Sequence, residues 1–256
     1  MRVGIISATP EERAELADAM TAPAEARIAG AHIETGTLDG IDVALADAGF
    51  GKVNAAIAAT LLVDRFLAGA LVLSGVAGGL DPALAIGDVV VAERVVVHDA
   101  GVIEEEGLRV YQPGHMPFLN PTSKLGYDAD RELLRETMAA IDELDLPPLS
   151  AAAGGGDKPK VVAGTVVSGA QYVNSESTRM RLHARYGGAA VEMEGGSVAQ
   201  VAEAFGVPWL VISSLSDLAG RESAFDFSAF FAEVSASSAA VVRRALPAVA
   251  AQRPQR

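Results

Sequence analysis

The chain has 256 residues, half of them hydrophobic, and a formal net charge of −13. A chain of this length can bury a substantial core as one α/β domain or two small ones. Its acidity disfavours nucleic acid as the main partner, because phosphate binding needs clustered lysine and arginine. No segment reaches the roughly 18 uninterrupted apolar residues of a membrane span. We therefore expect small molecules or a second copy of the chain as partners, and no membrane.

Cysteine content and the N-terminal residues bear on location. The chain contains no cysteine, which excludes disulfides and thiolate metal sites and is typical of cytosolic proteins. Residues 2–8 form the continuous apolar run of a buried strand and lack the features of a signal peptide. We expect a cytoplasmic protein.

A helix start follows this first strand. Thr9 is a plausible N-cap, Pro10 occupies the first helical position, and Glu11 and Glu12 stand in the first turn. A modest helical face continues to Met20. In one interpretation, the two acids interact favourably with the helix dipole. In the other, they lie at the carboxyl end of a strand, where open α/β sheets bind ligands.

A hairpin is predicted next, with strands over 31–38 and 41–48 joined by an Asp-Gly turn. Residues 47–54 then form a glycine-bearing loop that leads into a helix over 53–66. This loop lacks the spacing of a dinucleotide fingerprint and the ending of a P-loop. We therefore interpret its glycines as turn residues.

Two buried strands are predicted over 71–80 and 87–99, and the second contains His98, interpreted as a core or edge histidine. Residues 100–123 show no clear period. A loop of this length with aromatic residues indicates a functional segment. A helix is predicted over 130–144.

The glycine-rich stretch 147–159 is interpreted as a tolerated insertion and not as a domain boundary, because strand-like residues resume over 160–168. A last amphipathic helix is predicted over 227–246. We expect a single domain over residues 1–251, followed by a frayed tail over 252–256.

Residues 188–200 carry two carboxylates between a predicted strand and a predicted helix. Small residues run into Val191, Glu192 and Glu194 then flank Met193, and helical spacing follows. Carboxylates are seldom fully buried unless they are paired or hydrogen-bonded. The pair could form a site, or it could interact favourably with the helix dipole. This stretch alone leaves both interpretations open.

Glu12, Glu194 and Asp217 all follow predicted strands, the last of them a strand over 208–213 that leads into Ser214–Asp217. Strands that alternate with helices predict a mostly parallel or mixed sheet. Three carboxylates without enough histidine or cysteine for a zinc site indicate acid/base chemistry. Mg²⁺ is the competing interpretation, since it prefers oxygen ligands. The acids stand singly on separate strands, so we expect no metal and no cofactor.

With these residues in view, the chain resembles the purine nucleoside phosphorylase/uridine phosphorylase superfamily, and within it the 5′-methylthioadenosine/S-adenosylhomocysteine nucleosidases. The likeness covers nearly the whole chain and rests on the order of short motifs: Gly4-Ile-Ile with Glu11-Glu12, Gly49–Asn54, Gly75–Leu80, Gly87–Val91 with His98-Asp99, Val191–Glu194 and Ser216-Asp217. The resemblance implies a three-layer α/β/α sandwich around a mixed, partly barrel-like β-sheet. It also implies a homodimer.

The resemblance assigns a role to each acid. Asp217 would donate a proton to N7 of adenine, Glu12 would act as general base on the attacking water, and Glu194 would hold the ribose hydroxyls. Asp217 then needs a pKa raised by burial, whereas Glu12 should stay ionised until it accepts a proton.

The resemblance also implies a surface for the substrate. Tyr172 would stack on the purine, the Val173 backbone would read the base edge, Met193 would pack on the sugar, and Phe227 would line the 5′-substituent pocket. The loop around 105–118 would reach into the neighbouring subunit's site. The other expected contacts are Val76, Ala77, Gly78, Glu192 and Ser216.

Two positions depart from the family pattern. Ser213 stands where nucleosidases often have arginine, and Val76 stands where many relatives have serine. Phosphate sites depend on charge-assisted donors, so both departures favour hydrolysis over phosphorolysis. They also leave the water-activating network open, with Arg221 as a candidate replacement.

We therefore expect hydrolysis of 5′-methylthioadenosine and S-adenosylhomocysteine to adenine and a 5-substituted ribose. The alternatives are a phosphate-dependent purine nucleoside phosphorylase, a hydrolase preferring 6-amino-6-deoxyfutalosine, and a nucleoside-binding protein without activity. Retention of all three acids disfavours the last, since binding alone needs no general acid.

Overall fold

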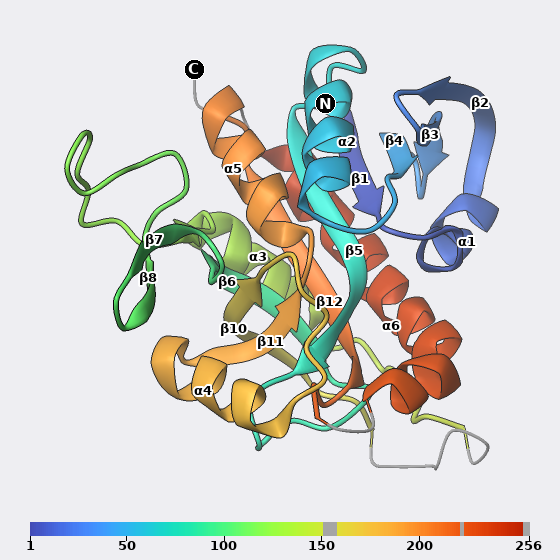
Figure 1. Ribbon diagram of the computed structural model, residues 1–256. Coiled ribbons are helices and arrows are strands. Elements are labelled where there is room, and N and C mark those ends of the chain that lie inside the picture. Colours follow the sequence, from blue (N-terminus) through green and yellow to red (C-terminus); the bar gives the residue numbers. More distant parts are fainter. Residues whose placement is uncertain (151–157, 221–222, 253–256) are drawn as a thin grey trace.

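The structure is a computed structural model that describes residues 1–150, 158–220 and 223–252, with side chains from residue 230 onward in the last range. Strands and helices alternate along much of the chain (Figure 1). The strands are β1 (Val3–Ser7), β2 (Met20–Ile28), β3 (Ala31–Leu38), β4 (Ile41–Asp47), β5 (Ala70–Gly79), β6 (Val89–Val97), β7 (Gly101–Glu104), β8 (Gly107–Val110), β9 (Tyr127–Asp128), β10 (Val161–Ser168), β11 (Gly188–Glu192) and β12 (Trp209–Asp217). The helices are α1 (Pro10–Asp18), α2 (Lys52–Asp64), α3 (Arg131–Ile141), α4 (Glu176–Tyr186), α5 (Gly195–Phe205) and α6 (Ser223–Ala251).

A mixed sheet forms the centre of the fold. Its strand order is β11-β10-β6-β12-β5-β1-β4-β3-β2, and β9 pairs with β6 beside this path. Strand β11 also pairs with β5, where Ala190 and Val191 lie opposite Gly79 and Gly78. The strands from β11 to β5 therefore close into a barrel, and the predicted partly barrel-like sheet is confirmed.

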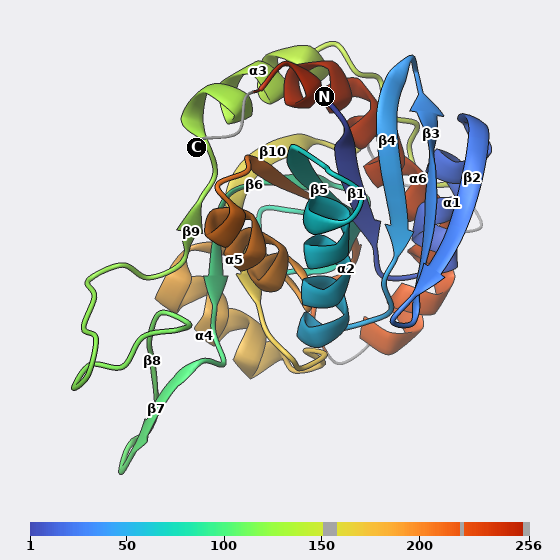
Figure 2. The same ribbon diagram turned by 90° about the horizontal axis from the view of Figure 1, so that it is seen from above.

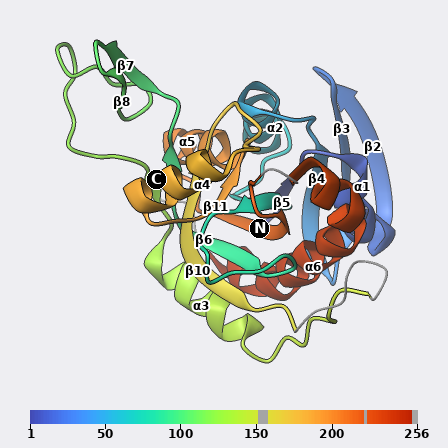
Figure 3. The same cartoon turned by 60° about the horizontal axis from the view of Figure 1, so that its bottom comes forward.

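Helices cover both faces of the sheet, as the predicted three-layer arrangement requires. Helices α1 and α3 pack against α6, which lies on β12 and β5, while α2 and α5 pack together on the other face. Figure 2 shows α2 and α5 on one side of the strands and α3 and α6 on the other. In Figure 3 the barrel strands lie between these two layers.

Buried strands explain why the two larger clusters of the core lie on opposite faces of the sheet. Successive side chains of a strand point to opposite faces, and a strand covered on both faces is apolar throughout. Leu210 and Ile212 of β12 share a cluster with Val242 of α6. Val211, between them, belongs to the cluster that contains Val198 of α5. The long apolar strands were predicted for this reason.

The N-terminal region holds both a confirmed prediction and a wrong one. The hairpin of β3 and β4 turns at Asp39 and Gly40, whose φ values of 51° and 81° are those of a tight hairpin turn. The helical face predicted to reach Met20 is wrong, because α1 ends at Asp18 and Met20 begins β2. Most of β2 is exposed, so it lacks the apolar pattern that reveals a buried strand.

Three further elements differ from the prediction. The segment 100–123 contains the small hairpin of β7 and β8, which lies apart from the main sheet (Figure 1). Helix α4 was not predicted, because Leu182 is its one buried residue among those described and no apolar stripe marks it. The last strand continues to Asp217 and does not stop at residue 213.

Two predicted flexible segments fall largely outside the described residues. Residues 151–157 of the glycine-rich stretch and 253–256 of the tail are not described. Gln252 is described, and its side chain donates to Glu136 Oε2 at 3.1 Å. Among the described helices, none is both long and apolar enough to cross a membrane.

Candidate active site

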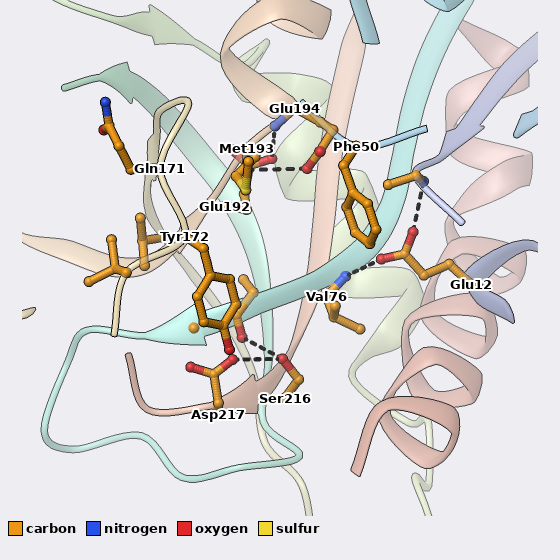
Figure 4. Close-up of a pocket in the computed structure, with 15 residues that line it drawn as sticks. Glu12, Phe50, Val76, Gln171, Tyr172, Glu192, Met193, Glu194, Ser216 and Asp217 are labelled. Carbon is orange, nitrogen blue, oxygen red and sulfur yellow. Dashed lines mark hydrogen bonds between the residues drawn. The ribbon is translucent and has the colours of Figure 1, made fainter. Parts of the chain in front are cut away.

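A pocket opens where β1, β5, β11 and β12 reach their carboxyl ends, the position at which α/β sheets bind ligands. Figure 4 shows its side chains converging from separate elements. The pocket is lined by Ala8, Glu12, Phe50, Val76, Ala77, Gly78, Gln171, Tyr172, Val173, Val191, Glu192, Met193, Glu194, Ser216 and Asp217. Every predicted site residue is among them except Phe227, whose side chain lies outside the described residues.

Sequence reasoning missed four lining residues, Ala8, Phe50, Gln171 and Val191. Phe50 had a usable signal, because an aromatic residue inside a glycine-bearing loop seldom serves a turn. It is 57% exposed and points into the pocket opposite Tyr172 (Figure 4). Gln171 adjoins Tyr172 and had no signal of its own.

Glu12 is held by three backbone N–H groups. Its Oε2 accepts from Ala8 at 2.7 Å and Thr9 at 3.0 Å, and its Oε1 accepts from Val76 at 3.1 Å. The bond from Thr9 completes a capping box with the Thr9 hydroxyl. Glu12 therefore has both roles that the sequence left open, since one carboxylate starts the helix and lines the pocket.

Burial raises the pKa of Glu12 to about 7, although the three N–H groups oppose this shift by stabilising the carboxylate. The expectation that Glu12 stays ionised is therefore only half right. Near neutral pH the group is divided between its two forms. A pKa close to the working pH suits a general base, because the group can both accept and release a proton.

The two glutamates of the β11–α5 junction have different surroundings. Glu192 Oε2 accepts from the N–H groups of Glu194 at 2.8 Å and Gly195 at 2.6 Å, at the start of α5. Glu194 Oε1 accepts from Gly51 N, in the loop before α2, at 2.6 Å, and its Oε2 accepts from Met193 N at 3.2 Å. Glu192 thus stabilises the helix start, and Glu194 faces the pocket.

Burial raises the pKa of both carboxyls. For Glu194 the value reaches about 8, because the neighbouring charge of Glu192 adds to the effect of burial. Two acids this close do not ionise independently. Burial and the neighbouring acid therefore favour the protonated form of Glu194, which can donate as well as accept hydrogen bonds.

Asp217 lies at the opposite end of the pocket from Glu194 (Figure 4). It ends β12 and is 2% exposed. Its Oδ1 accepts from Ala219 N at 2.7 Å, and its Oδ2 accepts from the Ser216 hydroxyl at 3.0 Å. A side chain at Gly78 would place its Cβ 3.0 Å from Asp217 Oδ1. Glycine at 78 therefore leaves the room that this carboxyl occupies.

The two departures from the family pattern have different positions. Val76 contributes its backbone N–H to Glu12, a bond that does not depend on the valine side chain. Ser213 is buried inside β12 between Gly75 of β5 and Val90 of β6. It does not reach the described lining of the pocket. Arg221, the candidate replacement, lies outside the described residues.

The positions of the pocket's carboxylates are relevant to the alternative interpretation that they bind Mg²⁺. Glu12, Glu194 and Asp217 enter from different sides, and each is bonded to its own backbone N–H groups. Among the described residues, one group of three histidine or acid side chains has ligand atoms that all lie within 4.8 Å of one another, and it consists of Glu25, His32 and Glu34 on β2 and β3. That cluster lies outside the pocket.

The family model of the phosphorylase superfamily matches residues 2–247, so the chain belongs to this superfamily. It is similar to the 5′-methylthioadenosine/S-adenosylhomocysteine nucleosidase of Mycobacterium bovis, with 50% identity over 97% of this chain and 98% of the relative. Among solved structures, the 5′-methylthioadenosine/S-adenosylhomocysteine nucleosidase of Colwellia psychrerythraea in complex with adenine has a TM-score of 0.83 and 32% identity, covering 97% of this chain and 96% of that one. The futalosine hydrolase of Helicobacter pylori has a TM-score of 0.81 and 26% identity, covering 96% of this chain and 97% of that one. The resemblance predicted from the sequence is confirmed.

Proposed function

We propose that this protein is a nucleosidase that hydrolyses the N-glycosidic bond of 5′-methylthioadenosine and S-adenosylhomocysteine, releasing adenine and a 5-substituted ribose. The observation that carries the proposal is the pair Glu12 and Asp217, two buried acids at separate positions in one pocket. Such a pair can serve both ends of a glycosidic bond. The names and the near-complete coverage of the relatives support this substrate class.

Each acid has a task in this reaction. Asp217 protonates N7 of adenine, so that the base leaves as a neutral molecule. Glu12 takes a proton from the water that attacks C1′. The bond to adenine breaks as positive charge develops on the ribose, and preorganised carboxylates nearby stabilise that charge. Glu194 binds the ribose hydroxyls through the face that Gly51 and Met193 leave open.

The remaining lining residues fit the parts of an adenine nucleoside. Tyr172, which is half exposed, stacks on the purine, and the Val173 backbone meets the base edge. Met193 packs on the sugar. Phe50 lies on the side opposite Tyr172 (Figure 4), where it covers the ribose and its 5′-substituent.

Hydrolysis is favoured over phosphorolysis by the charge of the side chains that line the pocket. In the described part of the pocket lining the charged side chains are all acidic, and a phosphate dianion would meet carboxylates without a cation to balance them. A water molecule has no such cost. No cofactor is needed, since the acids supply every proton.

The test is adenine release from 5′-methylthioadenosine with and without inorganic phosphate. We expect equal rates in both and free 5-methylthioribose as the sugar product. A rate that requires phosphate, or a ribose 1-phosphate product, would contradict hydrolysis. S-adenosylhomocysteine and 6-amino-6-deoxyfutalosine serve as parallel substrates, and a higher kcat/KM for the latter would move the assignment toward the futalosine hydrolases.

We also propose that the protein is a cytoplasmic homodimer. An apolar groove between α2 and α5 is lined by Val53, Ile57 and Leu61, and Val53 is 72% exposed. Phe118 on the long loop is 81% exposed. A second copy would cover these side chains and bring its loop near the pocket. We expect a dimer mass in sedimentation and a shift toward monomer for Val53→Glu, whereas Val53→Ala should stay dimeric.

A further inference from the structure

Two loops form opposite walls of the pocket. The loop between β4 and α2 carries Phe50 and Gly51, and the loop between β10 and α4 carries Tyr172 and Val173. Phe50 and Tyr172 enter from opposite sides in Figure 4. Strands β4 and β10 are not neighbours, because β6, β12, β5 and β1 lie between them in the sheet. The sheet alone therefore does not tie one wall to the other.

A partly buried carboxylate joins the two loops. Asp99, just beyond β6, accepts from Lys52 Nζ at 2.6 Å through Oδ1 and from Ala170 N at 2.7 Å through Oδ2. Its side chain is 10% exposed. Lys52 follows Gly51, the residue that donates to Glu194, and Ala170 lies two residues before Tyr172. One side chain thus connects the part that holds Glu194 with the part that carries Tyr172.

The bridge is charged and closely packed. Burial disfavours the charged form of Asp99, but its bonds to Lys52 and Ala170 outweigh burial and hold its pKa below the usual range. The loop beyond β10 also lies directly on His98, since a Cβ at Gly169 would fall 2.1 Å from His98 Nε2. Charge-assisted bonds are about twice as strong as neutral ones. The removal of either partner from this partly buried pair therefore loosens the contact between the two loops.

We propose that Asp99 is a positioning residue that holds the two walls of the pocket at the separation an adenine nucleoside requires. This positioning role rests on the proposed function, because it takes an adenine nucleoside as the substrate. The bridge between the two loops does not depend on that function. Asp99 is not among the residues that line the pocket, so it acts through the loops. A displacement of about 1 Å in such walls can cost about 100-fold in rate.

Three variants separate the two bonds. Asp99→Ala removes both, Asp99→Asn keeps an acceptor for Ala170 but loses the charge, and Lys52→Met keeps the carboxylate on Ala170. We expect Asp99→Ala to lower kcat/KM for 5′-methylthioadenosine by roughly 10- to 100-fold, mainly through KM. Lys52→Met should have a smaller effect. The pH at which kcat/KM rises should not move, since the acids are unchanged.

Amide hydrogen exchange reports on the bridge without any substrate. We expect Asp99→Ala to speed exchange in both 48–54 and 169–175, and Lys52→Met to speed it in 48–54 alone. Asp42→Ala is the matched control, because it breaks the more exposed ion pair with Arg2 and should leave both segments and KM unchanged. If Asp99→Ala does not fold, Asp99→Asn and Lys52→Met still test the Lys52 half of the bridge, because each removes the charged bond and should speed exchange in 48–54; unchanged exchange there in both variants would overturn the bridge.

The outcomes distinguish the two proposals. Unchanged exchange in both loops of Asp99→Ala would overturn the bridge. Faster exchange with an unchanged KM would leave an ordinary structural ion pair and overturn the positioning role. If the wild-type protein releases no adenine from any nucleoside, the proposed function fails, and exchange still decides whether the bridge exists.

Discussion

Asp217→Asn is expected to lower kcat for adenine release by roughly 10²- to 10⁴-fold, the usual contribution of a general acid or base. Asparagine has the shape of aspartate and can still accept from Ala219 N. Its amide group can donate to the Ser216 hydroxyl in place of the bond that Ser216 now donates. The site therefore keeps its structure and loses its transferable proton. KM should change little, because the substrate's contacts remain.

A change of leaving group shows whether the loss is one of acid catalysis. The nitrophenolate group of a nitrophenyl riboside leaves as a stable anion and needs no protonation. Hydrolysis of this substrate should therefore be far less sensitive to Asp217→Asn than hydrolysis of 5′-methylthioadenosine. Ser216→Ala is the matched control, since it removes the neighbouring hydroxyl but keeps the acid. Equal losses on both substrates would contradict the acid role, as would a near-wild-type kcat on the nucleoside.

The sequence was sufficient to predict the barrel strands and the pocket because both depend on patterns that burial imposes. A strand such as β12, covered on both faces, begins with a fully apolar run, and a carboxylate at its end is then conspicuous. Strand β2 and helix α4 have little buried surface and therefore no such pattern. Helix α4 did carry end signals, with Ser175 as N-cap and Gly187 at φ 63° after its last turn.

The protonation of the site could not be predicted from the same patterns. The pKa of Glu12 depends on how deeply it is buried and on an N–H group from Val76, which lies 64 residues away in sequence. The contact between Glu194 and Gly51 spans 143 residues. Such distances come only from the folded sheet. The same holds for Asp99. Its motif can be recognised in the sequence, but the two residues that bond to it in the folded protein cannot.

Glu12→Gln is expected to lower kcat by roughly 10²- to 10⁴-fold through loss of the general base. The single oxygen of glutamine can still accept from Ala8 and Thr9, but its amide group then faces the N–H of Val76. An unsatisfied buried donor costs about 1–3 kcal/mol. The melting temperature should therefore fall as well, and activity must be measured well below it. Glu11→Gln, next along the helix and exposed, is the matched control for both readouts.

The pH profile separates the loss of a base from a loss of structure. With a pKa of about 7, Glu12 is protonated and inactive as a base below this pH and ionised above it. The kcat/KM of the wild-type protein should therefore rise through about pH 7, because this quantity reports groups of the free enzyme. The rise should be absent from Glu12→Gln and present in Glu11→Gln. A rise that persists in Glu12→Gln would transfer the base role to another group, for which Glu194, with a pKa of about 8, is the nearest candidate.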